Sequence, residues 1–160
     1  LSGVGIYSSI LSINSKIVST HLSSPLPIDG LPAAVSKANK HNVKSAMIWA
    51  PEAHFINNKW VIVYTSNQGK ANLMVSESSE LKSSFSEPFG ADFGRHHDPT
   101  IFMDGDQPWL VDKIAEITPL KKDFSGFAGK PIKIGASDRK MGHEGAYIIK
   151  VKDKKCSYFV

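Results

Sequence analysis

Two acidic residues, Asp98 and Glu144, are the strongest candidates for chemistry in this sequence. Asp98 directly precedes Pro99, and Glu144 lies in Gly142-His143-Glu144-Gly145-Ala146, where small residues allow a substrate to approach closely. A pair of carboxylates in a polar pocket suits hydrolysis of a glycosidic bond, in which one acid protonates the leaving oxygen and the other carboxylate activates water or attacks the sugar. On this spacing alone two other interpretations stay open: an Asp that satisfies turn amides, and an exposed loop Glu.

Three predicted β-hairpins position these acids. Their strand pairs are Glu52–Ile56 with Lys59–Thr65, Thr100–Met103 with Trp109–Val111, and Ala146–Val151 with Cys156–Val160. Polar residues, which favour turns, separate the two strands of each hairpin: Asn57-Asn58, Asp104–Gln107 and Lys152–Lys155. Helical periodicity is scarce, and only Leu31–Lys40 has the composition of a short helix. The pattern predicts an all-β chain.

The three hairpins also resemble one another at their starts. Ala50, Asp98 and Glu144 align, at steps of 48 and 46 residues. Repeats of strands at about 40–50 residues are typical of β-propeller blades, and we favour a propeller over a β-sandwich for this reason. The innermost strand of each blade lines the central channel, so Asp98 and Glu144 are expected to face each other across a pocket.

The chain length indicates a partial domain. At this spacing, 160 residues hold about three and a half blades. We expect a single partial domain over 1–160, with repeat units near 48–95, 96–142 and 143–160 onward. Residues 1–47 are expected to form the end of a preceding blade, with Val4–Thr20 as its closing part, plus a connection. No intact signal peptide is visible at the start of the sequence, so we expect the chain to begin after processing or within a longer protein.

Composition excludes several classes of function. The chain has 19 basic and 15 acidic residues, and this small, scattered excess predicts no nucleic-acid partner. No segment approaches the roughly 20 apolar residues of a membrane helix, so no membrane partner is expected. The single cysteine, Cys156, excludes an intrachain disulfide framework and any cysteine-based zinc site, and a buried, inert thiol is expected.

Several motifs then resemble family 43 glycoside hydrolases. Trp49-Ala50-Pro51-Glu52, followed by Lys59–Tyr64, is similar to the family's "WAPE…YYLYYS" blade, and Ser76-Glu77-Ser78 to Glu87-Pro88-Phe89 is similar to its "S…GPF" connection. His97–Asp106 resembles "IDPSIFxDDDG", and His143–Ile148 resembles "EGPYI", with Ala146 in place of the usual Pro. The resemblance covers about 48–160 and keeps the family's order.

The resemblance implies a five-bladed β-propeller, about three blades of which lie in this chain. It also implies an inverting glycosidase for arabinosides, xylosides or galactosides of plant or algal oligo- and polysaccharides. Glu144 would be the general acid, and Asp98 would orient that acid and tune its pKa. The family's general base is an Asp of the first blade; here only Asp29 precedes Trp49, in a turn-like setting, so the base is expected outside this chain.

Other polar and aromatic residues near these motifs are candidates for substrate binding. His97 and Arg95 lie beside Asp98 and would attract an anionic sugar, and His143 is a secondary catalytic candidate because related hydrolases of agar-type oligosaccharides use a histidine near the acid. Trp49 would stack on a sugar ring, whereas Trp60 and Trp109 are expected in the core between blades. Glu52 would bond sugar hydroxyls or serve a structural role.

Cofactors and alternatives complete these expectations. No cofactor and no transition-metal site is expected, although His96, His97, Asp98 and His143 are residues that could together bind a metal, and a structural calcium ion is a further alternative. The partner is a carbohydrate, and the location is secreted or periplasmic. The alternatives are a non-catalytic carbohydrate-binding propeller, an inactive fragment that lacks the general base, and a protein-interaction propeller. The sugar and its linkage are not encoded in the repeat.

Overall fold

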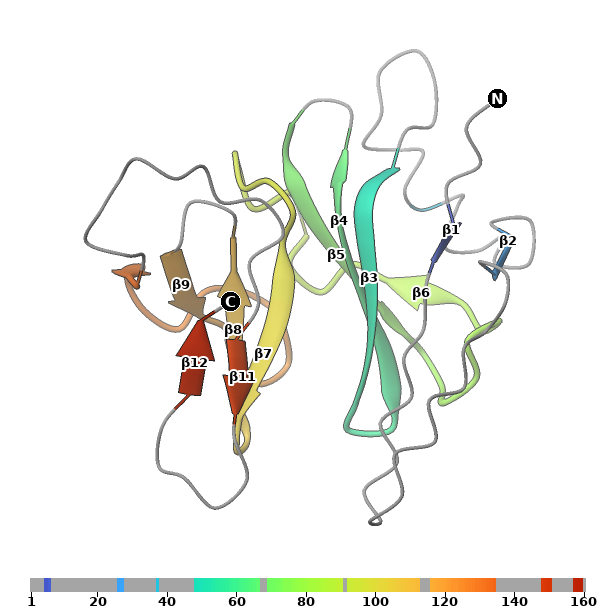
Figure 1. Cartoon of the computed structure of the whole chain (residues 1–160). Coiled ribbons are helices and arrows are strands. Elements are labelled where there is room, and N and C mark those ends of the chain that lie inside the picture. Colours follow the sequence, from blue (N-terminus) through green and yellow to red (C-terminus); the bar gives the residue numbers. More distant parts are fainter. Residues whose placement is uncertain are drawn as a thin grey trace.

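The computed structural model describes residues 5–6, 26–27, 37, 48–66, 69–90, 92–112, 116–134, 148–150 and 157–159, and these form β-strands joined by turns (Figure 1). The strands are β1 (Gly5–Ile6), β2 (Leu26–Pro27), β3 (Ile48–Ile56), β4 (Lys59–Ser66), β5 (Ala71–Ser76), β6 (Phe85–Ser86), β7 (Thr100–Asp104), β8 (Gln107–Val111), β9 (Glu116–Pro119), β10 (Ile132–Lys133), β11 (Ile148–Lys150) and β12 (Ser157–Phe159). The all-β prediction is therefore confirmed for the described part of the chain. Within the predicted helix Leu31–Lys40, one residue is described, Lys37, and it is helical.

The first sheet has the strand order β3-β4-β5-β6, and every neighbouring pair is antiparallel. Its first hairpin turns at Asn57 and Asn58, whose φ angles are 50° and 61°. Two successive left-handed residues make the tight turn that matches the twist of a hairpin, and asparagine tolerates this conformation better than most residues. The predicted hairpin is confirmed, and β3 begins four residues earlier than expected, at Ile48.

The second sheet has the order β10-β9-β8-β7, again antiparallel throughout. The sequence predicted a four-residue turn from Asp104 to Gln107, but these two residues pair with each other as the last step of the ladder. Only Gly105 and Asp106 form the turn, and Gly105 has a φ of 60°. A glycine at this place makes the two-residue turn possible without steric cost, which lengthens both strands beyond the prediction.

The outer strands of both sheets were missed by the sequence analysis. β5 is buried along its whole length, β6 and β10 contain two residues each, and β9 has four. Short edge strands carry too few residues for a period of two to be recognised, and a strand buried on both faces shows no alternation. The outer half of each sheet is therefore visible only in the folded chain.

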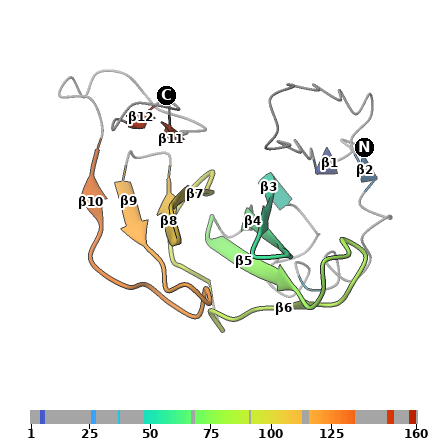
Figure 2. The ribbon, with the colours of Figure 1, turned by 90° about the horizontal axis from the view of Figure 1, so that it is seen from below.

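Two short strand pairs accompany the sheets. β1 pairs with β2, and β11 pairs with β12 in the register Ile148↔Phe159, which confirms the third predicted hairpin for its described residues. Figure 2 shows the β1–β2 pair beside the first sheet and the β11–β12 pair beside the second, so that the sheets follow one another in chain order. The ammonium of Lys150 in β11 lies 2.6 Å from a carboxylate oxygen of Asp104 in β7.

The main core lies between the two four-stranded sheets. One face of the first sheet packs against the second sheet through side chains that are 9% exposed or less: Ile56, Val61, Val63, Ala71, Leu73, Val75, Phe93, Ile101, Leu110, Leu120 and Phe124. Phe89, Phe93 and Phe127 extend this core with edge-to-face ring contacts. Because each buried aliphatic side chain contributes about 1.5–3 kcal/mol, this shared core holds the two sheets in a fixed relation.

The opposite face of the first sheet is also buried and contains Ile62, Tyr64, Met74 and Phe85. Tyr64 and Asn72 lie opposite each other in the β4–β5 ladder. Within the described residues, neither the Tyr64 hydroxyl nor Oδ1 of Asn72 has a hydrogen-bond partner. Burial raises the pKa of Tyr64, and the nearby charge of Glu87 raises it further. Strands β4 and β5 of the first sheet are thus buried on both faces over most of their length.

No helix in the described ranges combines the length and the apolar character needed to span a membrane.

Candidate active site

In each sheet, a short segment near the start of the first strand along the chain has an unusual backbone conformation. We name residues 49–52 and 97–100 the first and second opening segments. Ala50 has a φ of 42° and precedes Pro51, and Asp98 has a φ of 48° and precedes Pro99. A left-handed conformation is uncommon for residues other than glycine and costs about 1 kcal/mol or more, so its occurrence at both aligned positions marks them as structural equivalents. In β3 the segment coincides with a register shift between Trp49 and Glu52.

Asp98 is held in this conformation by the first sheet. Its backbone N–H donates to Oγ1 of Thr65 in β4, with 3.1 Å between the two atoms. Thr65 is fully buried, and Pro99 beside Asp98 is also buried. The Asp98 side chain is partly exposed. The backbone of Asp98 is therefore anchored across the boundary between the sheets, and its carboxylate retains access to solvent.

A second hydrogen bond crosses the same boundary. The Thr100 hydroxyl donates to Oε2 of Glu52, with 2.5 Å between the oxygens. Glu52 and Thr100 each lie two residues after the left-handed residue of their segment, so equivalent positions of the two sheets contact each other. Thr100 is 3% exposed, and a hydrogen bond to an ionised acceptor at such a site is worth about 1.5–3 kcal/mol.

His54 extends the contact along β7. Its Nε2 lies 3.4 Å from the backbone nitrogen of Ile101 and 3.3 Å from Oε2 of Glu52. One ring nitrogen either accepts from the Ile101 N–H or donates its own proton to Glu52, according to the tautomer. When its Nε2 accepts from the Ile101 N–H, His54 links β3 of the first sheet to β7 of the second.

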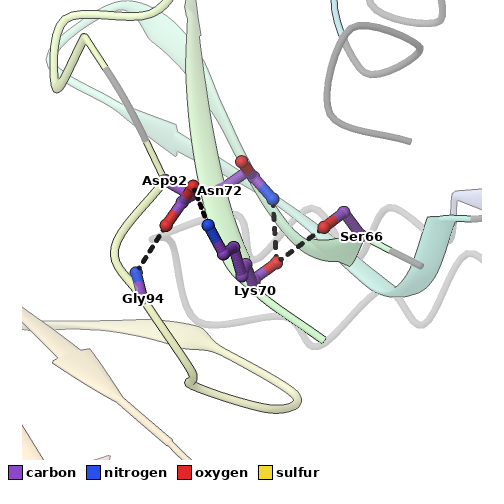
Figure 3. Close-up of polar contacts among 5 residues, drawn as sticks. All are labelled: Ser66, Lys70, Asn72, Asp92 and Gly94. Carbon is purple, nitrogen blue, oxygen red and sulfur yellow. Dashed lines mark hydrogen bonds and ion pairs between the residues drawn. The ribbon is translucent and has the colours of Figure 1, made fainter. Parts of the chain in front are cut away.

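The connection that leads to Asp98 is pinned to the turn between β4 and β5. Figure 3 shows the Asp92 carboxylate accepting from the Lys70 ammonium at 3.0 Å and from the Gly94 N–H at 3.0 Å. The carbonyl of Lys70 accepts from the Asn72 amide and from the Ser66 hydroxyl. The backbone of this connection also pairs with the first residue of β5, since Ala71 donates to the Gly94 carbonyl and accepts from the Phe93 N–H.

Three basic residues precede Asp98 and have different surroundings. Nδ1 of His96 lies 2.5 Å from Oδ2 of Asp112, whose side chain is 3% exposed, so His96 is tied to the end of β8. The ring of His97 lies near Gly69, where an added Cβ would be 3.5 Å from Nε2. Arg95 is exposed. Of the predicted substrate-binding residues, His97 and Arg95 thus lie in the segment that carries Asp98, with Arg95 the more accessible.

Trp49 lies close to the same place. It pairs with Thr65, the residue that accepts the Asp98 N–H, and it is 40% exposed. An exposed indole beside a carboxylate offers an apolar face on which a sugar ring can stack. Trp60, by contrast, packs against the buried far face of the first sheet and donates its indole N–H to the Ser79 carbonyl, as expected for a core residue.

Several predicted residues lie outside the described part of the chain, namely Glu144, His143, Asp29 and Cys156. Their predicted roles stay predictions. Among the described residues, no group of three or more His, Cys, Asp and Glu is arranged to hold a metal ion. The structure thus brings together Trp49, Glu52 and Asp98 at the boundary between the sheets.

Sequence reasoning missed three residues of this site: Thr65, Thr100 and His54. Thr65 contacts Asp98, His54 contacts Ile101, and Thr100 belongs to the second opening segment and bonds to Glu52. Thr100 and His54 occur inside quoted motifs or predicted strands, but a threonine or histidine in a strand has no pattern that reveals its partner. The sequence signal available was the alignment of Ala50 with Asp98, which makes Glu52 and Thr100 equivalent positions of the repeat.

Chemically, the site presents the partly exposed Asp98, whose backbone is bound to Thr65, and the exposed Trp49, which pairs with the same threonine. The hydrogen bonds to Thr65 and Glu52 lie on either side of Pro99, so the segment that carries Asp98 is restrained at both ends. Such preorganisation is what a carboxylate needs when it acts electrostatically on a neighbouring acid.

Comparison with known proteins identifies one matching family and several similar structures. The family described as Glycosyl hydrolases family 43 matches residues 30–160. The fold is similar to the family 43 protein BlXynB of Bacillus licheniformis, with a TM-score of 0.54, 24% sequence identity and coverage of 66% of this chain and 23% of that one. A protein described as a glycoside hydrolase matches with a TM-score of 0.54, 23% identity and coverage of 70% and 29%.

A third similar structure is an α-L-arabinofuranosidase of Clostridium thermocellum, with a TM-score of 0.52, 18% identity and coverage of 76% of this chain and 49% of that one. The chain therefore spans about a quarter to a half of the length of these structures. No curated protein is similar enough to count as a match. These likenesses establish a shared fold, and the family match over most of the sequence shows that the chain belongs to glycosyl hydrolase family 43.

Proposed function

We propose that the protein containing this chain is an inverting glycosidase. Glu144 acts as the general acid that protonates the leaving oxygen, and Asp98 orients this acid and keeps it protonated. A carboxylate outside the described residues activates the attacking water. The substrates are arabinosides, xylosides or galactosides in plant or algal oligo- and polysaccharides. Family membership supports the reaction class.

The observation that carries the proposal is the setting of Asp98. Asp98 is a left-handed residue whose N–H donates across the boundary of two sheets to Thr65, the residue with which the exposed Trp49 pairs. Strained backbone of this kind costs about 1–3 kcal/mol and persists where the surrounding structure enforces it, as it does at many functional sites. A negative charge held near a second carboxyl raises the pKa of that carboxyl, which is the property a general acid needs.

Around this pair we propose a substrate site and a closed propeller. Trp49 stacks on the sugar, and His97 and Arg95 bind its polar or anionic groups. The succession of sheets in chain order supports a ring of five blades, to which this chain contributes about three. His143 is a secondary candidate for proton donation. No cofactor takes part, and a structural calcium ion remains open. Because polymeric glycans lie outside cells, we propose a secreted or periplasmic protein.

The proposal is tested with the full-length protein and three classes of substrate: aryl arabinosides, aryl xylosides and agar oligosaccharides. Glu144→Gln removes the proton donor, and Asp98→Asn removes the charge that tunes it. We expect each variant to lower kcat by about a hundredfold or more. The anomeric form of the first product, followed by NMR, reports inversion. Hydrolysis that is unchanged in both variants contradicts the assignment of the two carboxylates.

The same experiment separates the enzyme from a carbohydrate-binding propeller. A binding protein retains oligosaccharide affinity in calorimetry and shows no turnover of any of the substrates. An enzyme shows turnover that depends on Glu144 and Asp98. Retained affinity without turnover in the unaltered protein would therefore replace the proposed activity by glycan binding.

A further inference from the structure

We propose that Glu52 is a positioning residue: acting through Thr100, and together with Thr65, it fixes the orientation of the Asp98 carboxylate. This inference deepens the proposed glycosidase function and rests on it. Of the two roles expected for Glu52, we favour the structural role over direct bonding to sugar hydroxyls. Glu52 is thereby assigned a function that its motif alone does not specify.

The contacts of Glu52 support this role. Its Oε2 accepts the Thr100 hydroxyl, and His54 Nε2 lies 3.3 Å from the same oxygen. Thr100 is 3% exposed, and the Glu52 side chain is 22% exposed. The carboxylate oxygen is thus directed at Thr100 in β7. The hydroxyl of Thr100 is buried, so a sugar has no access to it.

The segment on which Glu52 acts joins the β7–β8 ladder at its last residue, where Thr100 pairs with Val111. Pro99 has no N–H to donate, and Asp98 is left-handed immediately before it, a conformation that sterics disfavour. Two hydrogen bonds from the first sheet flank this proline: one from the Asp98 N–H to Thr65, and one from the Thr100 hydroxyl to Glu52. Loss of either bond lets the segment relax toward an ordinary extended conformation, which turns the Asp98 carboxylate away.

The position of Asp98 matters because its proposed action on the general acid is electrostatic. The interaction between two charges falls with distance, and it falls faster where water enters between them. If Asp98 turns away, the general acid loses the neighbouring charge that keeps it protonated, and its pKa decreases. The alkaline limb of the pH–rate profile, which reports loss of the acid's proton, then moves to lower pH.

The test uses Thr100→Val in the full-length protein, because valine keeps the buried volume and the β-branched shape and removes only the hydroxyl. We expect kcat to fall about tenfold with little change in KM, and the alkaline limb of kcat/KM to move down by about half a pH unit. Glu52→Ala should do the same. Thr100→Ser and Glu52→Gln, which keep a donor and an acceptor, should restore most of kcat.

Two control variants separate positioning from general destabilisation. Thr118→Val alters another buried threonine of the second sheet, and Asp104→Asn alters the far end of the same strand, β7. Both should leave kcat and the pH profile unchanged. Thermal unfolding by circular dichroism shows which variants are folded, and Glu52→Ala replaces Thr100→Val if the valine variant does not fold.

Three outcomes overturn the inference. A rise in KM with unchanged kcat in Glu52→Ala makes Glu52 a sugar ligand. A lower kcat with an unmoved alkaline limb makes the contact merely structural. A crystal structure of Thr100→Val in which Asp98 keeps its left-handed conformation also contradicts it, and this result does not depend on activity. If the unaltered protein shows no hydrolysis, the proposed function fails, and the same crystal structure still decides whether Glu52 positions Asp98.

Discussion

The two opening segments of the sheets have the same backbone and different chemistry. Ala50 and Asp98 are both left-handed and both precede a proline. Ala50 lies near the start of β3, and Asp98 lies two residues before β7. One position carries a methyl group and the other a carboxylate. Two residues later, the acid is in the first segment, as Glu52, and the second segment has Thr100. The two repeats thus share a backbone conformation and differ in the side chains that it carries.

The difference shows how a repeated scaffold produces one asymmetric site. Glu52 and Thr100, at equivalent positions, bond to each other across the boundary. The acid of the first sheet thereby supports the second, and both Glu52 and Asp98 are partly exposed. A carboxylate at both left-handed positions would place two like charges near each other, which disfavours the ionised state of both. Alanine at position 50 avoids this conflict.

The largest expected effect comes from making the second segment chemically like the first. Asp98→Ala is tolerated by the backbone, because Ala50 already adopts the same conformation. We expect the full-length protein to remain folded and kcat on aryl glycosides to fall by about a hundredfold or more. Asp104→Asn, which alters an exposed acid at the end of β7, the strand that follows Asp98, is the matched control. Equal kcat in Asp98→Ala and the unaltered protein would remove the functional difference between the segments.

A smaller effect is expected from the contact between His96, which directly precedes the second opening segment, and Asp112 at the end of β8. His96→Ala deprives the buried Asp112 carboxylate of its histidine partner. We expect a loss of about 2–3 kcal/mol in the free energy of unfolding, measured with denaturant. Lys70→Ala, which breaks an ion pair with side chains 41% and 28% exposed, should cost less than about 1 kcal/mol. Similar losses for both variants would show that the His96 contact has no special weight.

The strain common to both segments is tested with glycine. Ala50→Gly relieves the left-handed conformation and should raise the free energy of unfolding by about 0.5–1 kcal/mol. Ala53→Gly, three residues later in the same strand, has no such strain to relieve and should lower it by about the same amount. Denaturant unfolding compares the two variants directly. A loss of stability in both would mean that position 50 is not strained.

The smallest effect concerns the face of the first sheet that points away from the second. Tyr64→Phe removes a buried hydroxyl that has no partner within the described residues, so stability at pH 7 should change by less than about 1 kcal/mol. Burial raises the pKa of Tyr64 in the folded state above its ordinary value of 10.0, so the unfolded chain releases this proton first. The contribution of Tyr64 to stability is therefore complete below pH 10.0 and decreases as the pH rises further.

The variant tests this sign directly. Between pH 8 and about pH 11, the unaltered protein should lose more unfolding free energy than Tyr64→Phe does. An equal loss in both proteins would contradict the effect of burial on Tyr64.

Much of the fold was predictable from local patterns, as two hairpins illustrate. Asn57-Asn58 indicated the first turn because asparagine accepts the left-handed conformation, and the turn lies there. The position of the second turn was predicted correctly, but the predicted turn was two residues too long. Asp104 and Gln107 are of types that favour turns, and they nevertheless pair with each other. The outer strands β6 and β10 escaped prediction, since two residues carry no periodicity.

The candidate site was predictable in part. Asp98 and Trp49 were identified from their motifs, and the structure brings both to Thr65. Glu52 was identified without a settled role, because a motif gives the residue type and not its partner. Thr65 and Thr100 were not identified at all, since buried threonines are common in strands for reasons of shape.

The order of the hairpins, the repeat of 46–48 residues and the family are properties of the sequence, because each depends on residue types at short range or on motif order. The meeting of Glu52 with Thr100, 48 residues away, depends instead on the core between the two sheets. That core fixes the relation of the sheets by burying side chains from both, and only then do equivalent positions come within hydrogen-bonding distance. Local sequence patterns do not predict such a contact, so the hydrogen bonds that restrain the Asp98 segment depend on tertiary packing.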